Sequence, residues 1–271
     1  MINSHVNSLE WLQFSNLLQF ESIGHFVSTR IGGVSTGVFQ SLNLGLSSGD
    51  DLDHVLKNRT LLARAAGLEP GQFVVAEQVH SAAVAVVTAA DAGKGMFDAA
   101  SAIAQTDALI TQTPGLCLVA KSADCVPVLL YDPENRAVAA IHSGWKGTMQ
   151  CIAAQTINAM KENFGTRPSA LIAGIGPSNG PCCYEVGDDV VDTVAKVFDT
   201  NRPFLKYQPS KKKFHLDLWK TNEFILLEAG VNRKNIEIAA LCTQCNPQWF
   251  YSARRKETGR IFAGIFLKGR L

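Results

Sequence analysis

The chain has 271 residues, of which 46% are hydrophobic and 18% are charged, and its formal net charge is +1. A chain of this length and composition can bury a sizeable core without disulfides or metals to hold it together. The near-neutral charge and the lack of a basic run favour neither nucleic acid nor acidic membranes as partners. We therefore expect a small-molecule substrate.

The N-terminal residues MINSHVNSLEWLQF lack the basic and apolar regions of a secretory signal, and no apolar stretch approaches the length of a membrane span. Seven cysteines, an odd number without an export signal, argue against a framework of disulfides. We expect a cytoplasmic protein with mostly reduced thiols, folded as one domain over residues 1–271.

The predicted elements begin with a Gly- and Ser-rich loop over residues 28–49, and long loops in compact domains are often functional. A helix capped by Asp51 or Asp53 is expected to run to about Ala66, where Gly67 ends it. Strand-like runs follow at residues 73–79, 83–88, 107–111, 116–120, 126–132 and 137–142.

An amphipathic helix is predicted over about 148–164, followed by a strand in ALIAGIG and helices at about 188–198 and 217–229. Strands at 236–242 and 260–267 complete the chain. Adjacent strands followed by interspersed helices predict an α+β fold, with mixed or antiparallel sheets and flanking helices. The chain contains neither G-x-G-x-x-G after a strand nor a Walker A sequence, so the usual nucleotide-phosphate loops are missing.

The stretch SADCVPVLLYDPENRAVAAIHSGWKGT, residues 122–148, is typical of a β-hairpin with a turn at D-P-E-N. If Asp132 pairs with Asn135, Cys125 faces His142 with Cβ atoms about 4.5–5.5 Å apart, which suits two ligands of one metal. Cys125 could instead be a small buried apolar residue. Asp124 and the segment Ser143–Gly147, which precedes a helix, favour a functional site.

His80 ends the run FVVAEQV and is the best third ligand, because it also lies at a strand end. Two histidines and one thiolate leave a fourth position open, as in catalytic rather than structural zinc sites. The remaining histidines are expected on the surface or in packing roles: His5, His25, His54 and His215.

The other cysteines form a single C-x-x-C, Cys242 and Cys245, and an adjacent pair, Cys182 and Cys183, whose spacing is poor for chelation. We expect buried or loop thiols here rather than a zinc site made of cysteines alone. The zinc deaminase signature H-x-E…P-C-x-x-C is absent from the sequence.

The motifs QVHS, TDALIT, ADCVPVLLYDP, HSGWKGT, GIGPS, CYEVG, CTQC, SARR and TGR run over nearly the whole chain. In these motifs the chain resembles the YfiH-like family, whose members are called laccase-domain or multicopper polyphenol oxidases and are also described as purine nucleoside-cleaving enzymes. The resemblance implies a metal site, usually Zn²⁺ with Cu²⁺ as the alternative, formed by His80, Cys125 and His142.

The activity implied is phosphorolysis of purine nucleosides to free base and ribose 1-phosphate, with deamination of adenosine to inosine. The expected partners are adenosine, inosine, guanosine or methylthioadenosine and inorganic phosphate, and the protein is expected to be a monomer or weak homodimer. The catalytic candidates are the three metal ligands and Asp124, and the candidates for binding phosphate, ribose or base are Arg30, Asn43, Arg59 and Lys146.

The segment after His142 departs from the family's usual Ala-Gly-Trp-Arg-Gly, since Ser143 and Lys146 replace Ala and Arg. Lysine keeps the positive charge but loses bidentate recognition of phosphate. The change Lys146→Arg is therefore expected to alter the phosphate dependence without changing the metal content.

Three other functions are compatible with the sequence. A four-copper oxidase needs about ten histidines and the chain has six, but a single copper with phenol oxidation as a side activity is compatible with the ligand set. A metal-free hydrolase or amidase, acting for example on cell-wall precursors, would use Cys125 as nucleophile, His142 as base and Asp124 to orient it. The third is a binding protein without catalysis.

Overall fold

Two large β-sheets form the centre of the molecule in the computed structural model, which describes residues 1–6, 8–198, 203–210 and 212–271. Sheet A has the order β1-β2-β3-β15-β7-β4 and sheet B has the order β14-β10-β8-β9-β6-β5. A small sheet C has the order β11-β13-β12. Parallel pairs (β4 with β7, β5 with β6, β10 with β14) occur beside antiparallel ones, so sheets A and B are mixed.

The strands of sheet A are β1 Ile2–Val6, β2 Leu9–Gln13, β3 Ile23–Ser28, β4 Phe73–Val75, β7 Cys117–Ser122 and β15 Ile261–Leu267. Those of sheet B are β5 Val84–Val86, β6 Ala108–Thr111, β8 Val126–Asp132, β9 Ala137–Ser143, β10 Ile172–Ile175 and β14 Ile236–Ile238. Those of sheet C are β11 Glu185–Val186, β12 Leu205–Gln208 and β13 Lys213–Leu216. The α-helices of the described residues are α1 Leu52–Ala65, α2 Trp145–Met149, α3 Ile152–Phe164, α4 Asp188–Val197 and α5 Leu218–Glu228.

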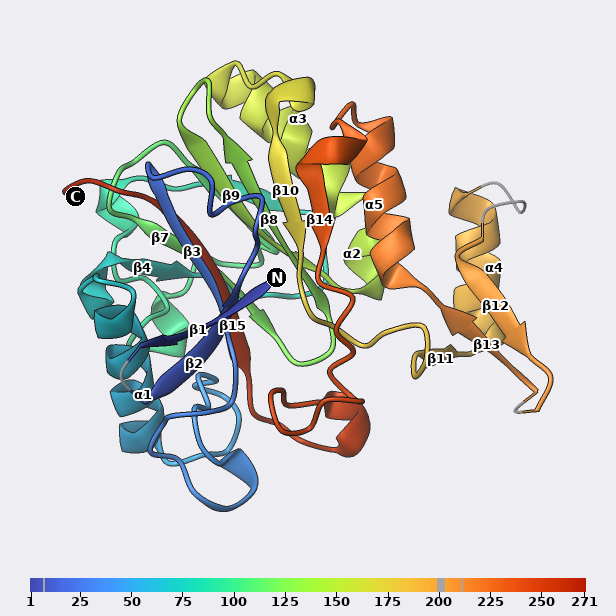
Figure 1. Cartoon of the computed structure of the whole chain (residues 1–271), viewed down its shortest axis with the longest axis horizontal. Helices are drawn as coiled ribbons and strands as arrows, with labels where there is room; N and C mark the ends of the chain where they lie inside the picture. The colour runs from blue at the N-terminus through green and yellow to red at the C-terminus, as the bar shows by residue number, and fades with distance from the viewer. Residues whose placement is uncertain (7, 199–202, 211) are drawn as a thin grey trace.

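The layers follow from the alternation of side chains along strands that are buried on both faces. In β8, Leu129 and Tyr131 pack between the two sheets, whereas Val128 and Leu130 pack toward α2, α3 and α5. Helix α1 covers the outer face of sheet A, on the side of the molecule opposite to α3 and α5 (Figure 1). The order helix, sheet, sheet, helix confirms the predicted α+β class with flanking helices.

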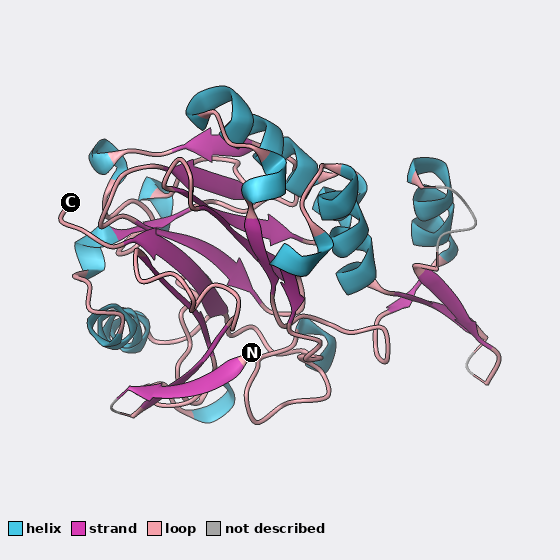
Figure 2. Ribbon diagram, turned by 45° about the horizontal axis from the view of Figure 1, so that its top comes forward, coloured by secondary structure: helices cyan, strands magenta, loops and turns pink. Residues whose placement is uncertain are grey.

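Sheet C and α4 lie on one side of the two-sheet body (Figures 1 and 2), and Val190 and Val194 of α4 belong to the same apolar core cluster as Ile225 of α5. These elements connect back to the body through the turn before β11 and through α5, which follows β13 directly. No helix in the described part of the chain is long and apolar enough to cross a membrane.

The predicted boundaries hold for α1, which Asp51 caps by accepting the N–H groups of Asp53 and His54, and which ends before Gly67 at φ +73°. The single helix predicted over 148–164 is wrong. It is split into α2 and α3 at Cys151, whose φ of +56° is left-handed and cannot continue a right-handed helix. The strands β1, β2 and β11–β13 were not expected from the sequence, since they are short and partly exposed.

Candidate metal centre and pocket

The hairpin of β8 and β9 positions two of the predicted ligands, but its predicted register is wrong. Asp132 pairs with Ala137, and His142 lies opposite Pro127 rather than Cys125. The turn contains four residues instead of two, because the Asp132 carboxylate accepts the N–H groups of Glu134 and Asn135. The shift is even, so Cys125 and His142 stay diagonal neighbours on the same face.

His80, Cys125 and His142 converge at one end of sheet B, with their ligand atoms all within 4.8 Å of one another. The distance from Cys125 Sγ to His80 Nε2 is 3.8 Å. A tetrahedral zinc ion with a Zn–S bond of about 2.3 Å and a Zn–N bond of about 2.05 Å would separate these atoms by about 3.6 Å. The donor set and its spacing therefore fit a metal ion.

Asp107, at the start of β6, holds two of these residues in place. Its carboxylate accepts a hydrogen bond from His142 Nδ1 at 2.8 Å, which leaves Nε2 as the ligand atom. The same carboxylate accepts the backbone N–H groups of Val79, His80 and Ser81 at 2.7–3.1 Å. These three bonds hold the turn at His80, whose φ is +63°.

The electrostatics of the site follow from this burial and bonding. Burial alone raises the pKa of Asp107, but the hydrogen bonds from His142 and Ser81 and the His142 charge lower it to about 2. Burial and the negative charge of Asp124 raise the pKa of the Cys125 thiol to about 12. Without a metal the sulfur is therefore protonated and a weak nucleophile, whereas a bound cation would displace the proton.

Gly144, which precedes α2, leaves room for two of the three ligands. A Cβ atom at this position would lie 2.9 Å from His80 Cδ2 and 3.0 Å from Cys125 Sγ. Its φ of −66° and ψ of 168° are open to any residue, so the need for glycine here comes from the close approach of the ligands.

A pocket of about 420 Å³ surrounds the three ligands. Its wall includes two aromatic residues, Trp145 and Tyr184, and three cations, Lys121, Arg254 and Arg260. Among the described residues, no carboxylate lies within ion-pair distance of these three cationic groups. The pocket therefore combines a possible metal centre with a site for an anion.

Asp124 lies in the pocket wall but its carboxylate is bonded to the C-terminal loop. It accepts hydrogen bonds from Thr243 Oγ1 at 2.5 Å, Ser252 Oγ at 2.9 Å and the N–H group of Arg254 at 2.9 Å. Its predicted catalytic role stays a prediction. Its hydrogen bond from the Arg254 N–H group indicates that it positions Arg254.

Two of the predicted substrate-binding residues have their polar groups engaged in the fold. Asn43 is fully buried and ties together its own loop, accepting the N–H groups of Gly45 and Arg260 and donating to Ser48 and Asp50. Arg59 is 2% exposed and donates to the carbonyl oxygens of Leu44, Gly95 and Met96.

The other two substrate candidates lie away from the pocket wall. Arg30 pairs with Glu257 at 3.0 Å and stacks over the ring of Tyr251. Lys146 is exposed, with Nζ 5.8 Å from the centre of the Trp145 ring, and it does not line the pocket. Their contacts with substrate stay predictions, and the three cations of the pocket wall are better placed.

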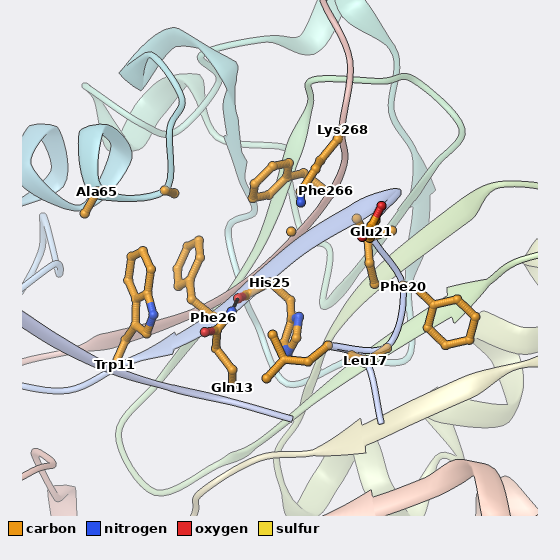
Figure 3. Close-up of a pocket in the computed structure, with 14 residues that line it drawn as sticks. Trp11, Gln13, Leu17, Phe20, Glu21, His25, Phe26, Ala65, Phe266 and Lys268 are labelled. Carbon is orange, nitrogen blue, oxygen red and sulfur yellow. Dashed lines mark hydrogen bonds between the residues drawn. The ribbon is translucent and has the colours of Figure 1, made fainter. Parts of the chain in front are cut away.

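A second hollow, of about 270 Å³, lies between β2, β3 and the end of α1 (Figure 3). Its wall is largely apolar and aromatic, and the polar groups of His25 and Gln13 are used locally. His25 Nε2 accepts the N–H group of Phe14 at 2.8 Å, and Gln13 donates to the carbonyl oxygen of His25. We assign it no chemistry.

Comparisons with known proteins place this geometry in a family. A family model described as multi-copper polyphenol oxidoreductase laccase matches residues 24–268. The chain belongs to this family. Its fold is that of YlmD from Geobacillus stearothermophilus, whose crystal structure matches with a TM-score of 0.91 at 34% identity over 98% of both chains.

Relatives in the same family carry enzyme names. The chain is 37% identical to a purine nucleoside phosphorylase of Bacteroides thetaiotaomicron, over 94% of this chain and 96% of that protein. It is 33% identical to adenosine deaminase RL5, from an unknown prokaryotic organism, over 96% and 99% of the two chains.

Proposed function

We propose that the protein is a zinc-dependent purine nucleoside phosphorylase that cleaves adenosine, inosine, guanosine or methylthioadenosine with inorganic phosphate and also deaminates adenosine. One observation carries the proposal: a single pocket combines His80, Cys125 and His142 with three cations that, within the described part of the chain, have no carboxylate at ion-pair distance. The names of the relatives support an enzyme of purine nucleoside metabolism.

The three cations would bind the phosphate. In phosphorolysis a phosphate oxygen forms a bond to the anomeric carbon of ribose while the bond to the purine nitrogen breaks, and the bonding electrons leave with the base. Lys121, Arg254 and Arg260 would hold the phosphate oxygens and fix the direction of attack. Arg254 is itself positioned, since its N–H group donates to Asp124.

Tyr184 and Trp145 offer flat apolar surfaces against which a purine can stack. His142 lines the same pocket, and its bond to Asp107 holds its ring in one orientation. A zinc ion bound to the three ligands would supply Lewis acidity beside the substrate. Deamination would replace the amino group at C6 of adenine by an oxygen from water and release ammonia.

The alternative of a metal-free cysteine hydrolase is less well supported by the site. The raised pKa of the Cys125 thiol, about 12, keeps the sulfur protonated at neutral pH. The orienting group predicted for such an enzyme, Asp124, does not bond to His142, because its carboxylate is bonded to Thr243, Ser252 and Arg254.

The test is turnover by protein purified without added metal, incubated with adenosine or inosine in the presence and absence of phosphate. We expect phosphate-dependent release of adenine or hypoxanthine with ribose 1-phosphate, and inosine from adenosine, all separated by chromatography. Elemental analysis should give one more zinc ion per chain in the wild type than in His80→Ala/Cys125→Ser, which assigns that ion to the ligand site. The proposal would be overturned by an assay that yields no free base and no inosine. It would also be overturned if phenol oxidation after addition of copper were the protein's single activity.

A further inference from the structure

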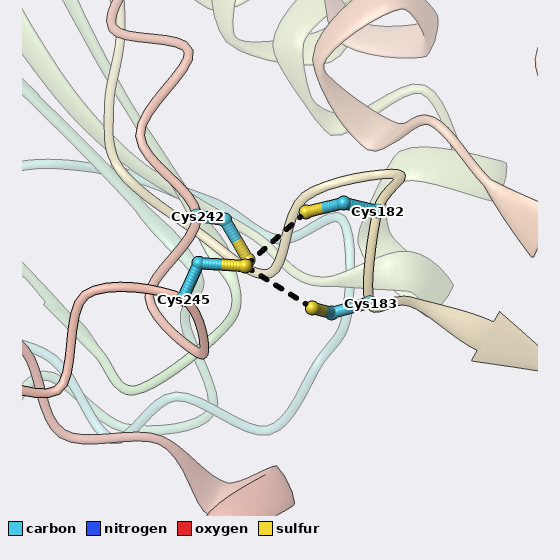
Figure 4. Close-up of side chains that lie close together, drawn as sticks. All are labelled: Cys182, Cys183, Cys242 and Cys245. Carbon is cyan, nitrogen blue, oxygen red and sulfur yellow. Dashed lines mark hydrogen bonds between the residues drawn. The ribbon is translucent and has the colours of Figure 1, made fainter.

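Four cysteines outside the pocket lie together on two loops (Figure 4). Cys182 and Cys183 belong to the turn between β10 and β11, and Cys242 and Cys245 belong to the segment after β14. Their sulfur atoms all lie within 4.8 Å of one another. The sequence favoured separate thiols at these positions, so their convergence is a finding of the fold.

The spacing of the sulfur atoms matches a tetrahedral metal centre. Cys245 Sγ is 3.6 Å from Cys182 Sγ and 3.4 Å from Cys183 Sγ. Four thiolates at about 2.3 Å from a zinc ion would have sulfurs about 3.8 Å apart, whereas a disulfide needs about 2.05 Å. We propose that Cys182, Cys183, Cys242 and Cys245 bind one zinc ion as a structural site, separate from the pocket.

Backbone contacts between the two loops bring the four cysteines together without a metal ion. Ser178 and Cys242 form a parallel β-bridge, and the N–H group of Thr243 donates to the carbonyl oxygen of Ser178 at 2.9 Å. Gly180 brings the loops closer still, since a Cβ atom there would lie 2.5 Å from the Trp219 ring and 3.1 Å from Cys242 Cβ. The two cysteine pairs therefore meet in the folded chain without relying on a bond between them.

The surroundings of the sulfurs suit thiolates held by a cation. The N–H group of Gly180 donates to Cys242 Sγ at 3.3 Å. Cys242 is the buried member of the cluster, so this hydrogen bond offsets part of the cost of placing a thiolate there.

A site with four sulfur ligands has no open position and serves structure rather than catalysis. Here the zinc ion would hold two segments of the pocket wall together. Tyr184 follows Cys183 directly and lines the pocket, and Thr243, beside Cys242, bonds to Asp124. The zinc ion would join these two segments, which are about sixty residues apart in the sequence.

The first test counts zinc ions in protein purified under reducing conditions without chelator. We expect two per chain in the wild type and one in His80→Ala/Cys125→Ser, which removes ligands of the pocket site. Adding Cys245→Ser should remove that remaining ion, whereas Cys151→Ser, a half-buried cysteine outside the cluster, should leave it. Absence of zinc from the His80→Ala/Cys125→Ser protein would overturn the proposal.

The second test needs no variant and no enzymatic assay, so it is independent of the proposed function. In the wild-type protein we expect slow alkylation of the four cysteines, which becomes fast when a chelator removes the zinc. Peptide mass spectrometry under non-reducing conditions identifies the labelled residues. A disulfide among the four, or labelling that the chelator does not change, would overturn the proposal.

Discussion

At the scale of single residues, Asp107 orders the candidate metal centre although it offers no ligand to the metal. One carboxylate fixes the ring of His142 and, through three N–H groups, the turn that carries His80. Its loss would therefore disturb two of the three ligands at once.

The change Asp107→Asn is expected to lower zinc affinity by about 10–100-fold, the usual cost of losing the group that orients a metal-bound histidine. The amide nitrogen would face N–H donors of the turn or of His142, and at least one of these donors would lose its acceptor. Competition with a coloured chelator, in the Cys245→Ser background, measures the affinity of the pocket site. Asp132→Asn is the control, because Asp132 is equally buried and bonds to a backbone turn far from the ligands. Unchanged zinc affinity in Asp107→Asn would contradict this role.

Lys121 predicts a pH dependence of phosphate binding. Burial and the positive charges of Arg59 and Arg260 lower its pKa to about 8. The ammonium group is charged below this pH and neutral above it, so KM for phosphate should rise as the pH increases from about 7.5 to 9.5. Lys121→Arg keeps the charge over this range and should flatten the profile.

The exposed Lys146 supplies the comparison for Lys121, because the two lysines are rival phosphate partners. The sequence predicts that Lys146→Arg alters the phosphate dependence, but Lys146 does not line the pocket, so we now expect this variant to reproduce the wild-type rise in KM with pH. A rise that persists in Lys121→Arg and disappears in Lys146→Arg would assign the phosphate to Lys146.

His80, Cys125 and His142 were predictable from the sequence, because histidine and cysteine are typical metal ligands wherever they lie in the fold. The sequence did not indicate Asp107, Lys121, Arg254 and Arg260, although the motifs TDALIT, SARR and TGR contain three of them. An aspartate or arginine has no distinctive signal until the fold shows what it faces. These four come from separate segments. Lys121, Arg254 and Arg260 become candidates because the fold brings them to one pocket wall, and Asp107 becomes one because it bonds to His142.

At the scale of elements, the hairpin was predictable and its register was not. Alternating apolar residues located β8 and β9, but the turn length depends on hydrogen bonds made by the Asp132 side chain. Similarly, apolar spacing indicated one helix where Cys151 interrupts it. Periodicity reports which face is buried, whereas single backbone angles decide where an element stops.

The junction of β9 and α2 predicts the effect of Gly144→Ala. The added methyl group meets His80 and Cys125 at 2.9–3.0 Å, so the ligands must move apart. We expect loss of most of the zinc from the pocket site, measured by elemental analysis in the Cys245→Ser background. Gly71→Ala is the control, since a methyl group there meets no atom within 4 Å. Full zinc content in the Gly144→Ala protein would show that the ligands tolerate the methyl group.

At the scale of the whole molecule, the α+β class was predictable because the strands appear as apolar runs without helical spacing. Their division between two stacked sheets was not, since both faces of these strands are buried and the sequence does not distinguish the partners.

The core also predicts a loss of stability in acid. Burial lowers the pKa of His25 to about 4, and Nε2 stays unprotonated as it accepts the Phe14 N–H group. Between pH 6.5 and 4 the unfolded chain binds a proton that the folded chain does not, so the free energy of unfolding falls by up to about 3 kcal/mol. Below pH 4 both states are protonated and the loss is complete.

Urea unfolding of His25→Gln between about pH 7 and 4.5 checks this sign. The variant should be less stable than the wild type at pH 7 but should lose about 2 kcal/mol less on acidification to pH 4.5. His5→Gln, on the exposed strand β1, is the control and should keep the wild-type slope. Equal slopes in His25→Gln and the wild type would assign the acid sensitivity to other groups.

The position of β15 has a consequence for how the protein folds during synthesis. This strand, Ile261–Leu267, is the last in the chain, yet it lies inside sheet A between β3 and β7. Until it has been synthesised, β3 and β7 have no common neighbour in sheet A. The sheet therefore closes late, and the unpaired edges of β3 and β7 are exposed to aggregation until then.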